Sequence, residues 1–422
     1  MRAACDAFAQ AVLIESGELG TTCARVGCMP SKLLLAAANG LHDARALAPR
    51  GIEGTHALEA DRACVLDYVR RERDYFVNGV LKDVDALPDG ALLRGQARFE
   101  LPNELRVGED MRVTAKRIVI AVGAAPVVPE ELRVFGDAFI TSDELFELRS
   151  LPKRIAVFGA GPIALELGQA LARLDIDVFM FGKGGDVAAL SDTPVRDTLA
   201  DEFYFDPDAK FDEMSLRDGK PYLRFTAPGG RHHRETFDLV LAATGRAPNL
   251  KALALEKAGI ELNEKGVPLF DENAMQCGQS HVFIAGDCDG TCPWLHDAAD
   301  EGKLAGDNAG RFPDVQAVKR KVPFSLVFCE PQVVNVVASY DSLDKQMTVD
   351  WRGIVRIAGT RVYDAAESRP ASRVCRCKNR QAARCARMRS SDGTSRAFTR
   401  VGFATGIDAG RMSETTLLSS RG

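Results

Sequence analysis

IAVFGAGPIALELGQALARL, residues Ile155–Leu174, is the stretch that decides the fold class. An apolar strand runs into Gly159, Gly161 and Ala164 in the spacing G-x-G-x-x-G/A, and a segment with helical apolar spacing follows at once. Gly159 permits the tight turn, Gly161 lets a pyrophosphate approach the backbone, and Ala164 lets the helix pack closely on the strand. The free N–H groups and the dipole at the helix N-terminus then hold the anion. The stretch predicts a dinucleotide-binding βαβ unit.

Similar apolar runs occur elsewhere in the chain. They are AVLIES at residues 11–16, RIVIAVGAAP at 117–126, DLVLAATGRAPN at 238–249 and HVFIAGD at 281–287. Short apolar strands that alternate with amphipathic stretches are typical of βαβ units around a buried parallel sheet. We therefore expect an α/β fold whose sites lie at the carboxyl ends of its strands.

The strand after the glycine motif bears on the choice of nucleotide. In IDVFMFGKGG, residues 176–185, an acid that binds the ribose hydroxyls of NAD should stand at the end of the strand. Gly182 stands there instead, and Lys183, which could meet the 2′-phosphate of NADP, follows it. The sequence leaves NAD and NADP both open.

Composition restricts the class of protein. The 422 residues are 46% hydrophobic and 27% charged, which suits a soluble globular protein of roughly two to four domains. A net charge of -5 argues against a nucleic-acid binder, and the 11 scattered cysteines do not form a secreted disulfide framework. No apolar run approaches the roughly 18 to 20 residues of a membrane-spanning helix, and the N-terminus does not match a secretory signal. We expect a cytoplasmic protein without nucleic-acid or membrane partners.

The N-terminal run AVLIES is predicted to be the second strand of another nucleotide-binding unit, with Glu15 at the ribose position. The first strand and its glycine-rich turn should lie roughly 20 to 30 residues earlier. Only fourteen residues precede Glu15, and none of them is glycine. We expect the chain to begin inside this fold.

GTTCARVGCMPSKLL, residues Gly20–Leu34, places Cys23 and Cys28 five residues apart. A working redox pair needs a positive charge or a helix N-terminus nearby that lowers the pKa of a thiol. The following PSKLLLAAANGL is predicted to be a helix with Pro30 near its first turn and Lys32 just inside it, so that Cys28 lies at its positive end. From the spacing alone, two unrelated thiols remain the alternative.

GTTCARVGCMPSK, followed by GAGPIALELG, ATGRAPN and FIAGD, closely resembles the flavin-dependent pyridine nucleotide disulfide oxidoreductases, and most closely the dihydrolipoamide dehydrogenases, over roughly residues 8–335. The resemblance implies two Rossmann-like domains that bind FAD and NAD(P), the first incomplete, and the remnant of an α+β dimerisation domain. The implied parts are a FAD-binding domain at 1–150, an NAD(P)-binding domain at 151–248, a central part at 249–320, the start of the interface domain at 321–367 and a non-native basic tail at 368–422. It also implies that dihydrolipoamide, or a lipoyl-bearing protein, is oxidised through the disulfide and FAD to NAD or NADP.

The resemblance further implies how the redox pair works. Cys23 would exchange with the substrate, and Cys28 would lie beside the flavin in charge-transfer contact. Lys32 would sit near the flavin N5 and pair with Glu166.

The remaining implied roles concern cofactor binding. Glu15 would bind the adenosine ribose of FAD, and Asp287, directly after Gly286, would bind its ribityl chain. Gly123 and Gly245 would form the turns where the chain passes between domains.

Other members of the family fit less well. Glutathione reductases differ after the second cysteine, where this chain has MPSK, and soluble transhydrogenases lack the paired cysteines. Mercuric reductase stays open, although the additional C-terminal cysteine pair of those enzymes is not recognisable.

A second cysteine group lies in GDCDGTCPWLHDAADEG, residues 286–302. Cys288, Cys292 and His296 invite a metal interpretation, but Pro293 interrupts the helical spacing and a fourth ligand is not evident. In the family this stretch begins a helix that packs against the flavin, so we expect no metal.

The family's catalytic base is a His-Pro, followed closely by Glu, that the interface domain extends across a homodimer. The histidines of this chain are His42, His56, His232, His233, His281 and His296, so none lies in that domain. The segment PFSLVFCEPQVVNV, residues 323–336, begins the domain; the match fades beyond Asp341 and ends after Glu367. We therefore expect a poor or inactive enzyme and doubtful homodimerisation.

The stretch RPASRVCRCKNRQAARCARMR, residues 369–389, is strongly basic. Three interpretations compete: a nucleic-acid arm, a metal clip through Cys375, Cys377 and Cys385, or a chain translated out of frame. A one-base shift after Glu367 can encode segments that resemble the interface domain and end on His-Pro, which favours the frameshift. An alternative to the redox enzyme as a whole is a nucleotide-binding module without redox turnover.

Overall fold

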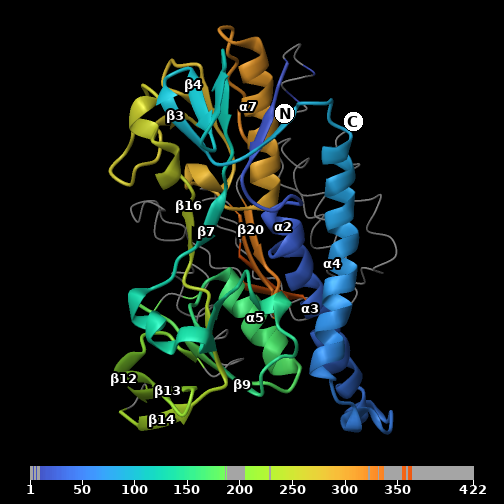
Figure 1. Ribbon diagram of the computed structural model, residues 1–422. Helices are drawn as coiled ribbons and strands as arrows, with labels where there is room; N and C mark the ends of the chain where they lie inside the picture. The colour runs from blue at the N-terminus through green and yellow to red at the C-terminus, as the bar shows by residue number, and fades with distance from the viewer. Residues whose placement is uncertain are drawn as a thin grey trace, which may run out of the picture.

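The computed structural model describes residues 10–185, 205–227, 230–321, 324–330 and 332–336, the positions Ala3, Asp6 and Val187, and the strands at 354–357 and 360–363. Figure 1 shows two lobes one above the other, with the long helix α4 (Arg62–Asp85) along one side. The basic stretch 369–389, its frameshift interpretation and most of the first nine residues lie outside the described residues.

The second lobe, residues 127–245, is built on a parallel sheet in the order β11-β10-β9-β15-β8. Its strands are β8 (Phe139–Thr141), β9 (Arg154–Phe158), β10 (Asp177–Phe181), β11 (Phe205–Asp206) and β15 (Leu239–Ala242). The glycine-motif helix α5 (Pro162–Arg173) follows β9, as the motif predicts. The sheet includes β8, so it begins earlier in the chain than the expected domain start at residue 151.

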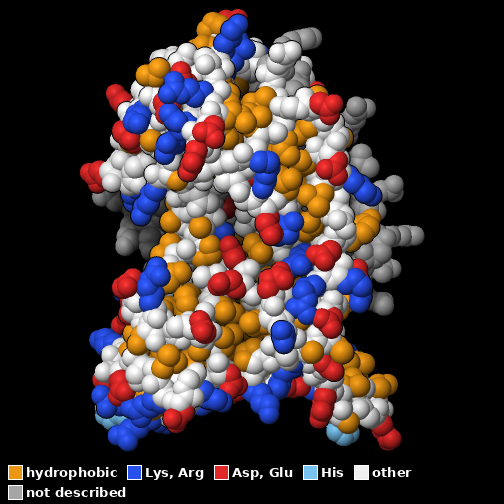
Figure 2. Space-filling view, in the orientation of Figure 1, with side chains coloured by type: hydrophobic (Ala, Val, Ile, Leu, Met, Phe, Trp, Pro, Cys, Tyr) orange, Lys and Arg blue, Asp and Glu red, His pale blue; other side chains and the backbone are white. Residues whose placement is uncertain are grey.

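An antiparallel meander covers the other face of this sheet. It consists of β12 (Lys210–Arg217), β13 (Lys220–Thr226) and β14 (His232–Thr236). Phe225 on β13 packs with Phe158 and Phe181 of the parallel sheet in a buried cluster. Burial of such aromatic side chains, each contributing a large apolar area, fixes the meander to the sheet. Figure 2 shows Lys and Arg side chains gathered at this end of the molecule, with Asp and Glu among them.

The first lobe contains two parallel strand pairs. β1 (Leu13–Glu15) pairs with β2 (Leu92–Arg94), and β6 (Ile118–Ile120) pairs with β19 (Val282–Ile284). The other elements of this lobe are β3 (Ala97–Leu101), β4 (Glu104–Val107), β5 (Met111–Thr114), β17 (Phe270–Asp271), β18 (Gln276–Cys277) and α7 (Leu295–Arg311). The runs AVLIES, RIVIAVGAAP and HVFIAGD therefore form strands as predicted.

A short antiparallel ribbon joins the lobes. β7 (Ala124–Pro126) carries the chain into the second lobe, and β16 (Arg246–Pro248) carries it back, with Ala124 opposite Pro248 (Figure 1). The backbone N–H of Asn249 donates to the carbonyl of Gly123 at 3.0 Å and extends the pairing by one step.

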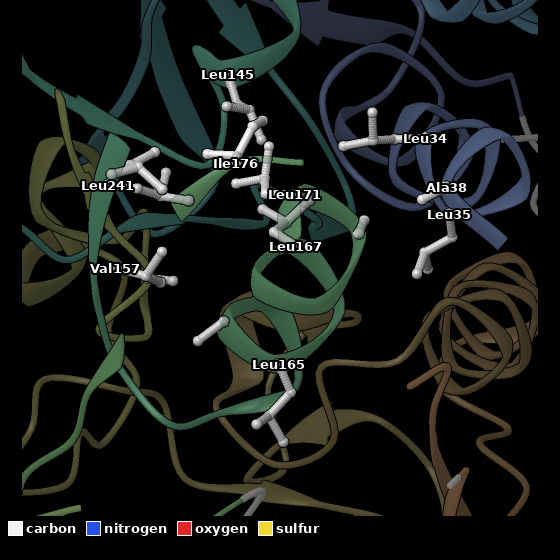
Figure 3. Close-up of a cluster of buried hydrophobic side chains, with 14 of the residues drawn as sticks. Leu34, Leu35, Ala38, Leu145, Val157, Leu165, Leu167, Leu171, Ile176 and Leu241 are labelled. Carbon is white, nitrogen blue, oxygen red and sulfur yellow. The ribbon is translucent and has the colours of Figure 1, made fainter. Parts of the chain in front are cut away.

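One buried core connects the cysteine-bearing helix to the second lobe. Figure 3 shows Leu34, Leu35 and Ala38 of α3 (Cys28–Arg45) facing the α5 side chains Leu167 and Leu171, behind which lie the strands of the parallel sheet. The buried side chains Val327, Cys329 and Val333 belong to the same core. Val327 and Val333 lie on β20 (Phe324–Val327) and β21 (Val333–Val336), and Cys329 lies in the connection between them. The same sheet contains β22 (Ile354–Ile357) and β23 (Thr360–Tyr363). Burial of this apolar area, at about 25 cal/mol per Å², holds the three segments together.

The remaining helical segments are short. They are α2 (Thr22–Arg25) and the 3-10 turns Ala48–Arg50, Thr55–Ala57, Glu130–Ala138, Leu145–Glu147, Lys251–Leu253, Leu255–Lys257 and Asp287–Asp289. None of the helices in the described part of the chain combines the length and the apolar character needed to cross a bilayer.

Candidate redox and nucleotide-binding site

A glycine turn brings the two cysteines together. Cys23 lies in α2, which Thr21 caps by accepting a hydrogen bond from the Ala24 N–H at 3.2 Å. Cys28 is the first residue of α3, and Gly27 before it folds the chain back on α2. A Cβ at position 27 would lie 3.1 Å from the Thr22 carbonyl oxygen and 3.2 Å from the Cys23 Cα. Glycine therefore permits this approach, and the predicted helix after Cys28 is confirmed.

The two thiols have different acidities. They are half-buried and hydrogen-bonded to one another. The hydrogen bond from the Cys23 thiol, assisted by the charge of Lys32 and opposed by burial, lowers the pKa of the Cys28 thiol to about 7. The same hydrogen bond and burial raise the pKa of Cys23. Near pH 7 a large share of Cys28 is therefore thiolate, whereas Cys23 keeps its proton.

Lys32 lies one helical turn after Cys28, and besides a 3.4 Å hydrogen bond to Ser31 Oγ it contacts two residues from distant segments. Its Nζ is 2.5 Å from Glu166 Oε2 on α5 and 4.5 Å from the centre of the Phe328 ring. The other oxygen of Glu166, Oε1, accepts the Phe328 backbone N–H at 2.9 Å. The expected Lys32–Glu166 pair is thus present, and Phe328, directly after β20, contacts both of its members.

The glycine motif of the second lobe has the geometry of an anion-binding turn. Gly159 has φ +132°, and a Cβ there would lie 2.2 Å from the Ala243 carbonyl oxygen. Gly161 is the N-cap of α5, and a Cβ there would meet no atom within 4 Å. Ala164, in the first turn of α5, is fully buried. The open side of Gly161 fits a pyrophosphate on the free N–H groups of α5.

The chain after β11 packs against the end of β10 and leaves no room for a side chain at Gly182. A Cβ at Gly182 would lie 2.9 Å from the Pro207 carbonyl oxygen, so the chain after β11 takes the space of a side chain. Lys183 is exposed next to it. An acid cannot stand at position 182 without displacing this chain, which explains the glycine but leaves the nucleotide preference open.

Comparisons with known proteins bear on this arrangement. A family model described as pyridine nucleotide-disulphide oxidoreductase matches residues 1–302. The chain belongs to this family. Members of the pyridine nucleotide-disulphide oxidoreductases contain FAD and use NAD(P). The redox cysteines and the glycine motif of α5 both lie within the matched residues.

Relatives of this chain include mercuric reductases and dihydrolipoyl dehydrogenases. The chain is 31% identical over 346 residues to a mercuric reductase of Acidithiobacillus ferrooxidans, a match that covers 78% of this chain and 60% of that one. It is 29% identical over 348 residues to a dihydrolipoyl dehydrogenase of Trypanosoma brucei brucei, covering 78% and 71%. The chain therefore spans about 60% of the length of the mercuric reductase that it matches.

The solved structures show the same fold. The HOCl-induced flavoprotein disulfide reductase RclA from Escherichia coli, as its Cu(II) complex, superposes with a TM-score of 0.67 at 21% identity. The superposition covers 80% of this chain and 74% of that one. The α/β class with Rossmann-like units, predicted from the glycine motifs, is confirmed.

The residues expected to bind the flavin of this oxidoreductase lie at strand ends. Glu15 ends β1, and its Oε1 accepts the Gly17 N–H at 2.8 Å. Asp287 follows Gly286 after β19, and burial raises the pKa of its carboxyl group. Carboxylates at the ends of parallel strands have the chemistry that sugar and ribityl hydroxyls require. These residues fit FAD at two of its hydroxyl-bearing parts.

Gly123 and Gly245 lie where the chain enters each of the two strands of the ribbon. Gly123, with φ +64°, directly precedes β7, and Gly245, with φ +113°, directly precedes β16. Arg246 then donates to both oxygens of Asp143, at 2.7 and 3.2 Å, and fixes the start of β16 to the second lobe. The structure thus gathers Cys23, Cys28, Lys32 and Glu166 in one cluster and places the other expected residues around the strand ends.

The second cysteine group lacks the arrangement of a metal site. Cys288 is fully buried and donates to the Ala285 carbonyl at 3.3 Å, and burial raises its pKa to about 11. Among the residues that the structure describes, no group of three or more His, Cys, Asp or Glu side chains could hold a metal ion.

Three residues of the site carried no role in the sequence analysis. Gly27 forms the turn between the cysteines, and Phe328 contacts both Lys32 and Glu166. Glu301 of α7 is buried and accepts the Gly286 N–H at 2.8 Å, which supports the turn before Asp287. The glycine beside Cys28 was a usable signal for Gly27, but the other two depend on contacts between distant segments.

Proposed function

We propose that this chain acts as a flavin-dependent disulfide oxidoreductase that takes two electrons from a dithiol, dihydrolipoamide or a related compound, and delivers them to NAD or NADP. The observation that carries the proposal is the hydrogen-bonded Cys23–Cys28 pair, in which the Cys28 thiol has a pKa of about 7. Family membership and the open N-terminus of α5 support the nucleotide half of the reaction.

The difference in acidity assigns the order of thiol exchange. When a thiolate attacks a disulfide, one sulfur forms the new bond and the other leaves as a thiolate. The sulfur whose thiol has the lower pKa leaves faster, so attack falls on the other one. A substrate thiolate would therefore attack Cys23 of the oxidised pair and release Cys28 as a thiolate next to Lys32. The second substrate thiol then attacks the substrate sulfur bound to Cys23. This forms the substrate disulfide and releases Cys23, which retains one proton, while the other goes to solvent.

The chemistry that FAD supplies when bound is two-electron transfer between the thiol pair and the nicotinamide ring. The residues of this chain have two tasks in the proposed reaction. The turn at Gly161 binds the nucleotide pyrophosphate, and the Cys23 hydrogen bond and the Lys32 charge stabilise the Cys28 thiolate. The chain has no histidine after His296 to remove the proton from the attacking thiol. We therefore expect turnover to be slow, on the order of 10²- to 10⁴-fold below that of an enzyme with such a base.

A second candidate function is reduction of Hg(II) by the same thiol pair. The 31% identity to a mercuric reductase favours it, and thiolates are soft ligands suited to soft metal ions. Both candidates use Cys23 and Cys28, so only the substrate separates them.

Turnover by the full chain with added FAD tests the proposal. NADH or NADPH oxidation is followed with lipoamide or with Hg(II) as acceptor, in the wild type and in C23S, C28S and C64S. Lipoamide-dependent turnover that both C23S and C28S abolish supports the proposal, and turnover with Hg(II) alone supports the second candidate. Cys64 is exposed on α4 away from the pair, so C64S should leave the rates unchanged. Equal turnover in C23S and wild type overturns both.

A further inference from the structure

Phe328 contacts both members of the partly buried Lys32–Glu166 ion pair near the redox cysteines. Its backbone N–H donates to Glu166 Oε1 at 2.9 Å, and its ring lies 4.5 Å from the Lys32 ammonium. The ammonium therefore contacts both a carboxylate and the face of an aromatic ring. A cation is attracted to such a face by the ring quadrupole, and the attraction grows as water is excluded.

The position of Lys32 matters because of the helix that carries it. Cys28 and Lys32 are four residues apart on α3, so their side chains lie on the same face of the helix. The Lys32 side chain is 30% exposed, whereas that of Glu166 is 9% exposed. Apart from Phe328, only the carboxylate and a long hydrogen bond to Ser31 Oγ, at 3.4 Å, hold the ammonium in the described structure, so it could turn toward solvent while remaining near the carboxylate. The ring of Phe328, itself 38% exposed, lies 4.5 Å from the ammonium and adds a contact that the carboxylate does not supply.

We propose that Phe328 is a positioning residue that holds the Lys32 ammonium beside the Cys28 thiol. The ring acts on the thiol only through Lys32, because its contacts are with the ammonium and the carboxylate. The proposal rests on the proposed role of Cys23 and Cys28 as the redox pair. It adds a component from the segment after β20, far from both cysteines in the chain.

The charged and titratable groups around the thiol come from several elements. Cys23 on α2 and Lys32 on α3 lower the pKa of Cys28, and Glu166 on α5 raises it. Cys329, next to Phe328, is buried and interacts with Glu166. If the Lys32 ammonium moves away from Cys28, the negative charge of Glu166 is less compensated, so the pKa of Cys28 should rise.

The pH dependence of Cys28 alkylation tests the proposal. The reduced full chain is treated with iodoacetamide at a series of pH values, and peptide mass spectrometry gives the pH at which alkylation of Cys28 is half-maximal, its midpoint. In F328L the midpoint for Cys28 should rise by about half a pH unit, which lowers alkylation at pH 7 about twofold. F328W, which keeps an aromatic face, should retain the wild-type midpoint. F76L, which changes a half-buried aromatic residue on α4, serves as the matched control and should not shift it.

The same measurement in a K32M background separates an effect through Lys32 from a change of packing. If the proposal is correct, F328L adds no further shift once Lys32 is replaced. An unchanged midpoint in F328L, equal shifts in F328L and F328W, or a full further shift in K32M/F328L overturns it. Thiol ionisation is read without flavin or turnover, so failure of the proposed function would not alter the result.

Discussion

Lys32 Nζ lies 2.5 Å from Glu166 Oε2, although the two residues are 134 positions apart in the chain. The pair joins the helix of the redox cysteines to the helix of the nucleotide motif. E166Q leaves the ammonium without its charged partner but retains an oxygen for the Phe328 N–H. Because Glu166 is largely buried and Lys32 is partly solvated, we expect a loss of about 1 to 2 kcal/mol in the free energy of unfolding. Urea denaturation of E166Q, K32M and the double variant checks this; strictly additive losses would contradict a direct interaction.

The acidity of Cys28 predicts a characteristic pH dependence. The pKa of Cys28 lies at about 7 in the folded protein, below its ordinary value of 9.0, so its thiolate should predominate above pH 7 and the thiol below. C23A removes the hydrogen-bond donor and should move the alkylation midpoint of Cys28 upward. Cys64 provides an internal control, because its hydrogen bond with Asp61 raises its pKa. Equal midpoints for Cys28 and Cys64 in the wild type would contradict the prediction.

The turn at Gly27 predicts a steric effect on disulfide formation. In G27A the new methyl group would lie 3.1 Å from the Thr22 carbonyl oxygen and 3.2 Å from the Cys23 Cα, so α2 must move away from α3. Since disulfide geometry tolerates little displacement, we expect oxidation of the pair to slow by on the order of tenfold. Thiol counting during oxidation by lipoamide measures the rate.

G40A is the matched control for G27A on the same helix. Gly40 lies inside α3, and a methyl group at this position would meet no atom within 4 Å. Alanine there should leave the oxidation rate unchanged and stabilise the helix by up to about 1 kcal/mol. An equal slowing in both variants would show that the helix, not the turn, controls the rate.

The two glycines of the nucleotide motif should respond differently to alanine. A methyl group on Gly161 meets open space, so G161A should fold normally but bind NADH more weakly, on the order of tenfold, because the methyl group occupies the approach of the pyrophosphate. In G159A the methyl group would lie 2.2 Å from the Ala243 carbonyl oxygen, and the protein should lose stability instead. Fluorescence titration with NADH and thermal unfolding separate these outcomes. Unchanged affinity in G161A would place the pyrophosphate elsewhere.

The parts of the site that depend on residues close together in the chain could be predicted from the sequence. The helix after Cys28 was predictable because Pro30, Lys32 and the apolar spacing all act within a few turns, and it begins at Cys28 itself. The strand and helix around Gly159 were predictable for the same reason. The Lys32–Glu166 pair was expected only from the resemblance to a family, since no local pattern links two residues so far apart.

Contacts between distant segments could not be predicted in this way. Phe328 follows an apolar run that could have been any strand, and its place over Lys32 results from the packing of Val327 and Cys329 into the shared core. The glycine at position 182 suggested a choice between nucleotides, whereas the structure shows close packing against Pro207. The inclusion of β8 in the parallel sheet likewise arises from its pairing with β15, which lies far along the chain.

The ribbon of β7 and β16 makes residues 127–245 an insertion in the topological sense. Ala124 and Pro248 are paired neighbours, so the chain leaves the first lobe and returns to it at one place. Excising the inserted stretch would leave two ends that a single short turn could reconnect. Genetic exchange of this stretch between relatives requires two crossover points, one at each strand of the ribbon. The incoming unit must still present a carboxylate to Lys32 and an apolar helix face to α3.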